Sequence, residues 1–409
     1  MGPVRSVLVG LVVVLGAVAC GASDDAAAND SADLTGGSCP AADREALLAI
    51  ADAAATCADV EAPEVGPAVA FSTLRNAALS LAPALHRGRD AVFAPDEQQW
   101  VLGRMAYGPD LGLVDEDVDL WVLRGCSGTW EKLGSTRTTT KGSHETIEGM
   151  EDDGGRVYFP IPEAKRLGVG RHRIRLVVAG DRSQTDQYIE VLPRGTPFFV
   201  SDVDGTLTER LATDSHLICD EESEFPALLR TIIEGALPQP RLHEGTSAVF
   251  GTLAKAGYRP FYLTARSELL GGNTRAFLRE AKRGDGRGDL PAGTVHTTFT
   301  LLGAKNEAAE AFKADELARL EAKGFRVVLG FGNRTSDQDA YIAANVPYRF
   351  FYENPSTWLR DCSNVDGVPA LPASYAQLAS GDFRIQHYEA LAPAVLALAP
   401  VCSQLQPGQ

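Results

Sequence analysis

Three short polar stretches, each preceded by an apolar run, carry residues suited to phosphoryl transfer. The first is Ser201-Asp202-Val203-Asp204-Gly205-Thr206. A fixed carboxylate can attack phosphorus and form an aspartyl phosphate, so Asp202 is the candidate nucleophile. Asp204 can protonate the leaving alkoxide and then deprotonate the water that hydrolyses the intermediate. The pair therefore predicts hydrolysis of a phosphate ester.

An acidic calcium loop is the first alternative for this stretch. An EF-hand loop that began at Asp202 would need Gly at its sixth position and Glu at its twelfth, where Leu207 and Thr213 stand. The EF-hand is thereby excluded. An ordinary acidic turn remains an alternative for these letters taken alone.

The second and third stretches supply a hydroxyl and two oxygen ligands. Thr264, in Thr264-Ala265-Arg266, can hydrogen-bond a phosphoryl oxygen, although a helix N-cap is the commoner role for such a residue. Further on, Asn333 and Asp337 are hard oxygen ligands of the kind that Mg²⁺ prefers. Each motif alone could be a capped turn, but the three together favour a phosphatase site.

Apolar runs that alternate with helical segments must position these residues. The runs span 197–200, 259–263, 294–299, 326–331 and 348–352. Segments with helical periodicity lie between them, at 248–256, 274–282 and 308–322. This alternation predicts an α/β domain of the Rossmann-like type over 196–409, with a parallel sheet that places ligands at the carboxyl ends of its strands.

The chain before this domain changes period twice. From 89 to 195 apolar residues recur with period two at short intervals, which predicts a β-sandwich of the immunoglobulin-like kind. Between 39 and 88 the spacing is helical, over 41–55 and again over 68–85. The second stretch could face a membrane, but an amphipathic helix packed on its own protein is the commoner case.

The N-terminal pattern predicts an exported, membrane-anchored protein. An apolar run from Val7 to Val18 ends in Ala19-Cys20-Gly21, which resembles a bacterial lipoprotein signal in which Cys20 is acylated. Ordinary secretory cleavage and an uncleaved anchor remain alternatives. Residues 21–38 lack periodicity and basic residues, so we expect a flexible tether on the periplasmic or cell-surface side.

Six further cysteines suggest disulfides, because an exported chain meets an oxidising compartment. Fifteen pairings are possible, and Cys39 with Cys57 and Cys362 with Cys402 are the local choices. Neither pair has Cys-x-x-Cys spacing, which disfavours zinc and redox sites. The formal net charge of -16 argues against a nucleic-acid partner.

The three motifs resemble the haloacid dehalogenase superfamily, and more narrowly the C-terminal phosphatase domain of lipins, over about 196–352. A related domain occurs in phosphatidylinositol-transfer proteins. The resemblance implies that Asp202, the backbone carbonyl of Asp204, Asn333 and Asp337 hold Mg²⁺. We expect Thr264 to be catalytic, together with Asp202 and Asp204, and Gly205, Thr206, Arg266 and Arg334 to bind the substrate.

The lysine that neutralises the phosphate in this superfamily has two candidates. Lys305, at the start of a predicted helix, is preferred. Lys313 is the alternative, and a surface position is the favoured interpretation for it. The segment between Leu207 and Gly257 is longer than is usual in lipins, which leaves the substrate open.

Three functions follow from these observations. The leading one is Mg²⁺-dependent hydrolysis of phosphatidate or a related lipid phosphate. A phosphatase for soluble phosphoesters is the second. The third is phosphatidate binding without hydrolysis, as in the transfer-protein relatives, and the presence of both Asp202 and Asp204 favours catalysis over it.

Overall fold

The computed structural model describes residues 48–50, 57–108, 110–208, 241–280, 290–301, 303–353, 365–372 and 380–391. The lipoprotein motif at Cys20, the tether and most of the segment between Leu207 and Gly257 lie outside these ranges. So do Cys39, Cys219, Cys362 and Cys402.

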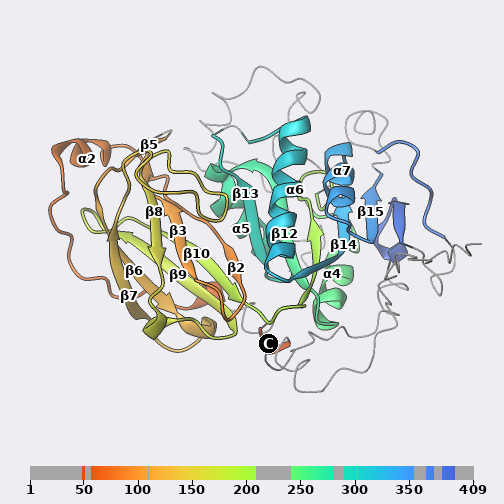
Figure 1. The fold of residues 1–409 in the computed structure, drawn as a ribbon, viewed down its shortest axis with the longest axis horizontal. Helices are drawn as coiled ribbons and strands as arrows, with labels where there is room; N and C mark the ends of the chain where they lie inside the picture. The colour runs from red at the N-terminus through yellow and green to blue at the C-terminus, as the bar shows by residue number, and fades with distance from the viewer. Residues whose placement is uncertain are drawn as a thin grey trace, which may run out of the picture. The chain divides into compact units, whose positions relative to one another are not determined.

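Two sheets form the sandwich in the first half of the chain (Figure 1). One sheet has the order β1-β3-β8, and the other has the order β2-β10-β9-β6-β7. The strands are β1 (Arg87–Gly88), β2 (Ala91–Phe93), β3 (Trp100–Arg104), β6 (Asp117–Leu123), β7 (Glu131–Arg137), β8 (Arg156–Pro160), β9 (Gly170–Val178) and β10 (Gln184–Val191). A small hairpin joins β4 (Ala106–Tyr107) to β5 (Leu111–Gly112). Inward-facing residues such as Val101, Leu120, Ile174 and Ile189 are fully buried, as the period-two pattern predicts.

Of the two helical stretches expected before the sandwich, the one over 41–55 lies mostly outside the described residues, and the one over 68–85 is less helical than the sequence suggests. Helix α2 covers only Leu74–Leu79, and Thr73 caps it by accepting from the Asn76 N–H at 3.1 Å. Leu74 is 91% exposed, so the apolar stripe is only partly packed on the sandwich. Within the described ranges, no helix combines the length and apolarity needed to cross a bilayer.

The disulfide joins a short helical turn, η1 (Cys57–Asp59), to the sandwich. Cys57 pairs with Cys126, which follows β6, across a sequence separation of 69. The local pairing of Cys39 with Cys57 is therefore wrong. The bond instead fastens the N-terminal segment to a strand end that is distant in sequence.

A six-stranded parallel sheet forms the second half, and it confirms the predicted α/β fold. Its order is β13-β12-β11-β14-β15-β16, the order 3-2-1-4-5-6 of a doubly wound fold. The strands are β11 (Pro197–Ser201), β12 (Arg259–Ser267), β13 (Thr294–Thr298), β14 (Arg326–Gly332), β15 (Tyr348–Tyr352) and β16 (Gly381–Ile385). The direction of winding reverses between β11 and β14, which is where such folds bind ligands.

Two apolar cores cover the two faces of this sheet. Phe199 of β11 packs with Val249 and Phe250 of α4 (Thr246–Lys255) and with Phe277 of α5 (Gly271–Glu280). Phe198 and Val200 face the other way, toward α6 (Asn306–Ala322) and α7 (Thr335–Ala343). Alternate residues of one strand thus enter opposite cores, which explains why the strand is apolar throughout.

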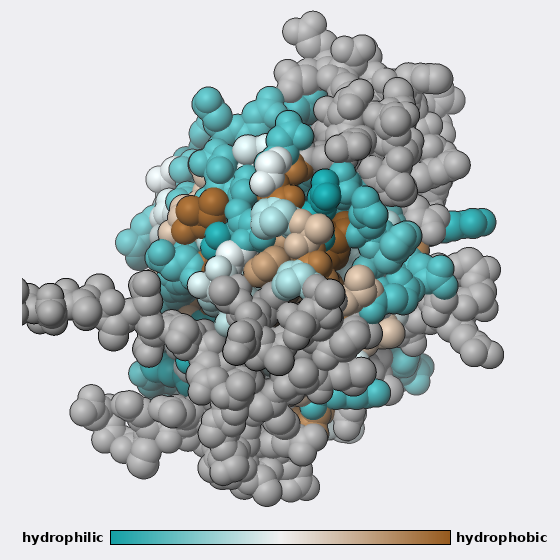
Figure 2. All heavy atoms as spheres, turned by 90° about the vertical axis from the view of Figure 1, so that its right-hand side faces the viewer, coloured by the Kyte–Doolittle hydropathy of each residue, from teal (hydrophilic) through white to brown (hydrophobic). Residues whose placement is uncertain are grey.

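Strand β16 closes the sheet and was absent from the sequence prediction. Four of its five residues are half-buried, as expected at a sheet edge. Figure 2 views the molecule from this side and shows apolar residues near the centre of a largely hydrophilic described surface.

The second core also includes residues from the sandwich. Val92, Ala94 and Leu192 belong to the same buried cluster as Phe198 and Leu317. The sandwich and the α/β part therefore share apolar packing as well as the polar contacts described below.

Candidate active site

Asp202 lies at the reversal of strand order, directly after β11. Its backbone N–H donates to the Phe331 carbonyl at 3.0 Å, so the contact between β11 and β14 holds it in place. Its side chain is buried, with the residue 5% exposed. The candidate nucleophile is therefore fixed by two adjacent strands.

Lys313 of α6 connects Asp202 to Asp337. Its Nζ lies 2.8 Å from Asp202 Oδ1 and also donates to Asp337 Oδ1. Burial raises the pKa of Asp202, Lys313 lowers it, and the neighbouring Asp337 and Asp204 raise it, so that the pKa is about 6 in all. Two buried carboxylates and one ammonium thus form a compact charged centre.

The surface position expected for Lys313 is wrong, because the residue is only 3% exposed. It shares one face of α6 with Ala309, Leu317 and Leu320, at positions i-4, i+4 and i+7. That spacing was available in the sequence and would have placed Lys313 on the buried face. Lys305, the preferred candidate, is an exposed N-cap residue of α6.

Asn333 and Thr206 hold the other side of Asp202. The Thr206 hydroxyl lies 3.2 Å from Asp202 Oδ2 and 3.1 Å from Asn333 Oδ1. Gly205 has a φ of +77°, and a Cβ there would lie 2.3 Å from Asn333 Nδ2. Glycine is therefore required for this close approach.

Asp337 caps α7 from its first turn. Its Oδ2 accepts from the backbone N–H groups of Asn333 and Arg334, both at 3.0 Å. Its Oδ1 remains directed at Lys313. The side chain of Asp337 is thus aimed by the helix start, with Arg334 half-buried at the N-cap position.

Arg266 forms an ion pair with Asp204, the candidate acid and base. Its Nε and Nη2 donate to Asp204 Oδ2 and Oδ1 at 2.7 and 2.5 Å, and its Nη1 donates to Thr274 Oγ1 at 3.0 Å. Burial lowers the pKa of the Arg266 guanidinium, but Asp204 outweighs it and raises the pKa overall. The paired bonds therefore fix the orientation of the Asp204 carboxylate, and each of its oxygens keeps a further lone pair that can take a proton.

Thr264 is buried inside β12, two residues before Arg266. The helix N-cap alternative for Thr264 is wrong, because β12 continues to Ser267 and Ser267 itself caps the next turn. Its Oγ1 accepts from the Arg266 N–H at 3.3 Å.

The oxygen ligands proposed for Mg²⁺ converge well enough to fit a hard cation. Oxygens of Asp202 and Asp337 already contact one shared positive group, and Asn333 Oδ1 lies within reach of the same threonine hydroxyl as Asp202. Within the described ranges no three His, Cys, Asp or Glu side chains are placed so that they alone could hold a metal ion, so any Mg²⁺ site must use amide or backbone oxygens as well.

Two aromatic residues support this site, and the sequence analysis missed both. The Tyr388 hydroxyl donates to the Thr206 carbonyl at 2.9 Å. His243 stacks on Tyr352 with ring centroids 3.7 Å apart, and burial lowers its pKa to about 4. Neither residue lies in a motif, and both come from segments distant from Asp202 in sequence.

Two family models match the chain. Residues 84–191 match the PITM 1-3 β-sandwich domain, which covers the observed sandwich. Residues 163–379, more than half of the chain, match LNS2 (Lipin/Ned1/Smp2). This range includes Asp202, Asp204, Arg266, Lys313, Asn333 and Asp337, but not Tyr388.

Several curated proteins are similar to part of this chain. Membrane-associated phosphatidylinositol transfer protein 2 of Mus musculus is 32% identical over 54% of this chain and 14% of its own length. The human transfer protein 3 is 28% identical over 46% of the chain and 16% of its own length. Protein retinal degeneration B of Drosophila melanogaster is 25% identical over 46% of the chain and 12% of its own length. The chain thus spans less than a fifth of these relatives.

Proposed function

Since the chain belongs to the LNS2 (Lipin/Ned1/Smp2) family, we propose that it is a Mg²⁺-dependent phosphomonoester hydrolase that forms an aspartyl phosphate. The observation that carries this proposal is the convergence of Asp202, Lys313 and Asp337 at the reversal of strand order, with Asp204 two residues from the nucleophile. A purely structural ion pair would not require the second, strand-end acid at Asp204.

The residues divide the reaction as follows. Asp202 attacks phosphorus while Lys313 offsets the negative charge of the phosphoryl oxygens. Asp204 gives a proton to the leaving alkoxide, and later takes one from the water that attacks the aspartyl phosphate. Mg²⁺, held by Asp202, the Asp204 carbonyl, Asn333 and Asp337, would supply further charge neutralisation.

We propose phosphatidate or a related lipid phosphate as the substrate. The family includes lipins, and the relatives are named as phosphatidylinositol transfer proteins associated with membranes. A soluble phosphoester is the alternative substrate. Phosphate release from phosphatidate in mixed micelles, compared with release from a sugar phosphate, separates the two.

The mechanism is tested by removing each carboxyl in turn. Asp202→Asn keeps the shape of the side chain but removes the nucleophile, so phosphate release should fall by at least about 1,000-fold, within the range seen for groups that act in the chemical step. Asp204→Asn should also stop turnover while substrate still binds. Circular dichroism checks that each variant is folded, and Asp119→Asn in the sandwich is the control. Near wild-type turnover by Asp202→Asn would refute the mechanism.

Lipid binding without hydrolysis is the second candidate function. It is favoured by the names of the curated relatives. Co-sedimentation with phosphatidate vesicles, with no phosphate released by the wild-type protein with or without Mg²⁺, would establish it in place of catalysis.

We further propose that the protein is exported and anchored through acylated Cys20, which would hold it near a lipid substrate. The support is the apolar run and small residues before Cys20. Cys20→Ser should move the protein out of the membrane fraction. An unchanged partition would contradict the anchor.

A further inference from the structure

Three arginines of the sandwich stand side by side and point at the α/β part. Arg87 of β1 is the register partner of Arg104 of β3, and Arg104 is the register partner of Arg156 of β8. All three are buried, with exposures of 6%, 4% and 2%. Like charges directly opposite one another destabilise a sheet, so this row requires compensating carboxylates.

The sandwich supplies two of the three carboxylates needed. Asp110 contacts Arg87 at 2.6 Å and Arg104 at 3.2 Å. Asp153 contacts Arg156 at 2.7 Å and also pairs with Arg104. Three guanidinium groups and two carboxylates leave one positive charge uncompensated within the sandwich.

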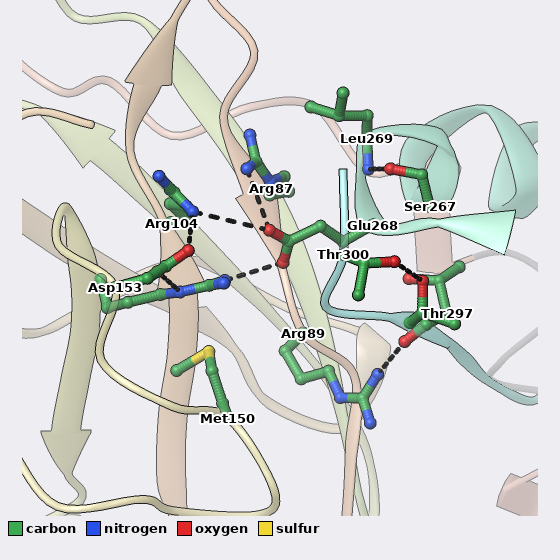
Figure 3. A network of polar contacts seen from close by, with 12 residues as sticks. Arg87, Arg89, Arg104, Met150, Asp153, Ser267, Glu268, Leu269, Thr297 and Thr300 are labelled. Carbon is green, nitrogen blue, oxygen red and sulfur yellow. Dashed lines mark hydrogen bonds and ion pairs between the residues drawn. The ribbon is translucent and has the colours of Figure 1, made fainter. Parts of the chain in front are cut away.

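Glu268 of the α/β part supplies the third carboxylate (Figure 3). Its Oε1 lies 2.9 Å from Arg87 and 4.0 Å from Arg104, and its Oε2 lies 2.7 Å from Arg156. Burial acts to raise the pKa of Glu268, but the arginines outweigh it and lower the pKa. Glu268 is therefore ionised at this contact. We call Arg87, Arg104, Arg156 and Glu268 the arginine clamp.

Glu268 of the clamp lies two residues after Arg266 of the candidate site. Glu268 directly follows β12, the strand end that carries Thr264 and Arg266. Arg266 makes the two bonds to Asp204. A shift of Glu268 would therefore move the guanidinium that orients the proposed acid and base.

A second contact reaches the helix of the catalytic lysine. Arg89, which follows β1, contacts Glu316 of α6 at 2.5 Å. It also donates to the Thr297 carbonyl at 2.7 Å, the contact drawn in Figure 3. Glu316 lies one helical turn after Lys313 on the buried face of α6. Arginines of the sandwich thus contact both the end of β12, which carries Arg266, and helix α6, which carries Lys313.

We propose that the β-sandwich is a positioning module for the active site, in which Arg87, Arg104 and Arg156 act through Glu268 to set Arg266 against Asp204. This inference rests on the proposed phosphatase function. The four clamp residues are positioning residues, since none of them contacts Asp202, Asn333 or Asp337 in the contacts described above.

The test compares Glu268→Gln and Arg156→Gln with a matched control, Arg137→Gln. Arg137 also pairs with two aspartates, Asp115 and Asp117, but its side chain is 52% exposed and belongs to the other sheet of the sandwich. Kinetics are measured with Mg²⁺ and phosphatidate micelles well below the melting temperature of each variant. A displacement of about 1 Å can cost about 100-fold in rate, so we expect kcat to fall about 10- to 100-fold in the clamp variants.

Two features separate positioning from a loss of stability. KM should change less than about threefold while kcat falls, and Arg156→Lys, which restores the charge, should recover part of kcat. Amide hydrogen exchange should accelerate at 264–267 in Glu268→Gln while β9 stays protected, because the loosening is local. The control should match the wild type in each measurement.

The outcomes also distinguish this inference from the proposed function. If the wild type releases no phosphate, the phosphatase proposal fails, and exchange at 264–267 decides the positioning role by itself. Unchanged exchange there, or unchanged kcat in folded Glu268→Gln, would overturn the positioning role.

Discussion

Replacing Lys313 with methionine should reveal the charged centre as a loss of stability in metal-free buffer. Methionine keeps the length and apolar body of the side chain but removes the ammonium. The variant would leave Asp202 and Asp337 buried together without the cation that both of them contact. Lys313 is 3% exposed, so solvent cannot take over its role.

The size of this loss follows from the geometry. At an effective dielectric constant of about 20, the attraction across the 2.8 Å contact with Asp202 is about 6 kcal/mol. Part of it is offset by the cost of burying the ammonium in the wild type. Removal of one partner from a buried ion pair typically costs about 3–5 kcal/mol, and we expect a value in that range.

The assay is urea denaturation with EDTA, followed by circular dichroism. Lys305→Met is the control, because an exposed lysine on the same helix should change the free energy of unfolding by no more than about 0.5 kcal/mol. Equal stability of Lys313→Met and the wild type would refute the charged centre described here. A large loss of stability in Lys305→Met would instead indicate that Lys305 is the lysine of the charged centre.

Three further predictions concern other parts of the chain. His172 accepts from the Gly125 N–H through Nδ1 and contacts the Gly168 carbonyl through Nε2, which requires the neutral ring, and burial lowers its pKa from 6.5 to about 4. The folded pKa lies below the unfolded one, so the neutral His172 ring contributes fully to stability above about pH 6.5. This contribution, up to about 3 kcal/mol, is lost as pH falls toward 4. His172→Gln should flatten the decline of stability with falling pH, and an unchanged slope would contradict this. Joint replacement of Cys57 and Cys126 by alanine should cost about 4 kcal/mol, the loop-closure value for a separation of 69, and thermal melts that coincide with the wild type would count against it. Gly205→Ala should reduce phosphate release at least about tenfold by displacing Asn333, whereas Gly251→Ala in α4, where a new Cβ meets nothing within 4 Å, should leave release unchanged; full activity in Gly205→Ala would show that the close approach is unimportant.

Local patterns predicted much of the α/β fold because the information lies within each segment. The run that forms β11 is apolar throughout, since its alternate residues enter two different cores. Strand β16 was missed because Gly381–Ile385 contains Asp382 and Arg384 at half-buried positions and resembles a loop. Helix α7 was missed because its first turn, with Asp337, was interpreted only as a ligand-bearing turn.

The parts that the sequence left open depend on contacts between distant segments. The choice between Lys305 and Lys313 is an exception, because the spacing of Ala309, Leu317 and Leu320 within α6 already marks the buried face that carries Lys313. Sequence proximity favoured Cys39 as the partner of Cys57, but the fold brings Cys126 to a Cα distance of 4.5 Å. The row of arginines on β1, β3 and β8 has no local signature, because register between strands creates it.

The short connection between the two halves has a consequence for how their contact could be disturbed. Only residues 192–196 separate β10 from β11, and five residues reach at most about 18 Å when extended. Each half therefore meets the other at an effective concentration of roughly millimolar or more, whatever the concentration of the protein in solution. An isolated sandwich added in trans to a truncated α/β part would have to reach a similar concentration before it restored the contact between the two halves.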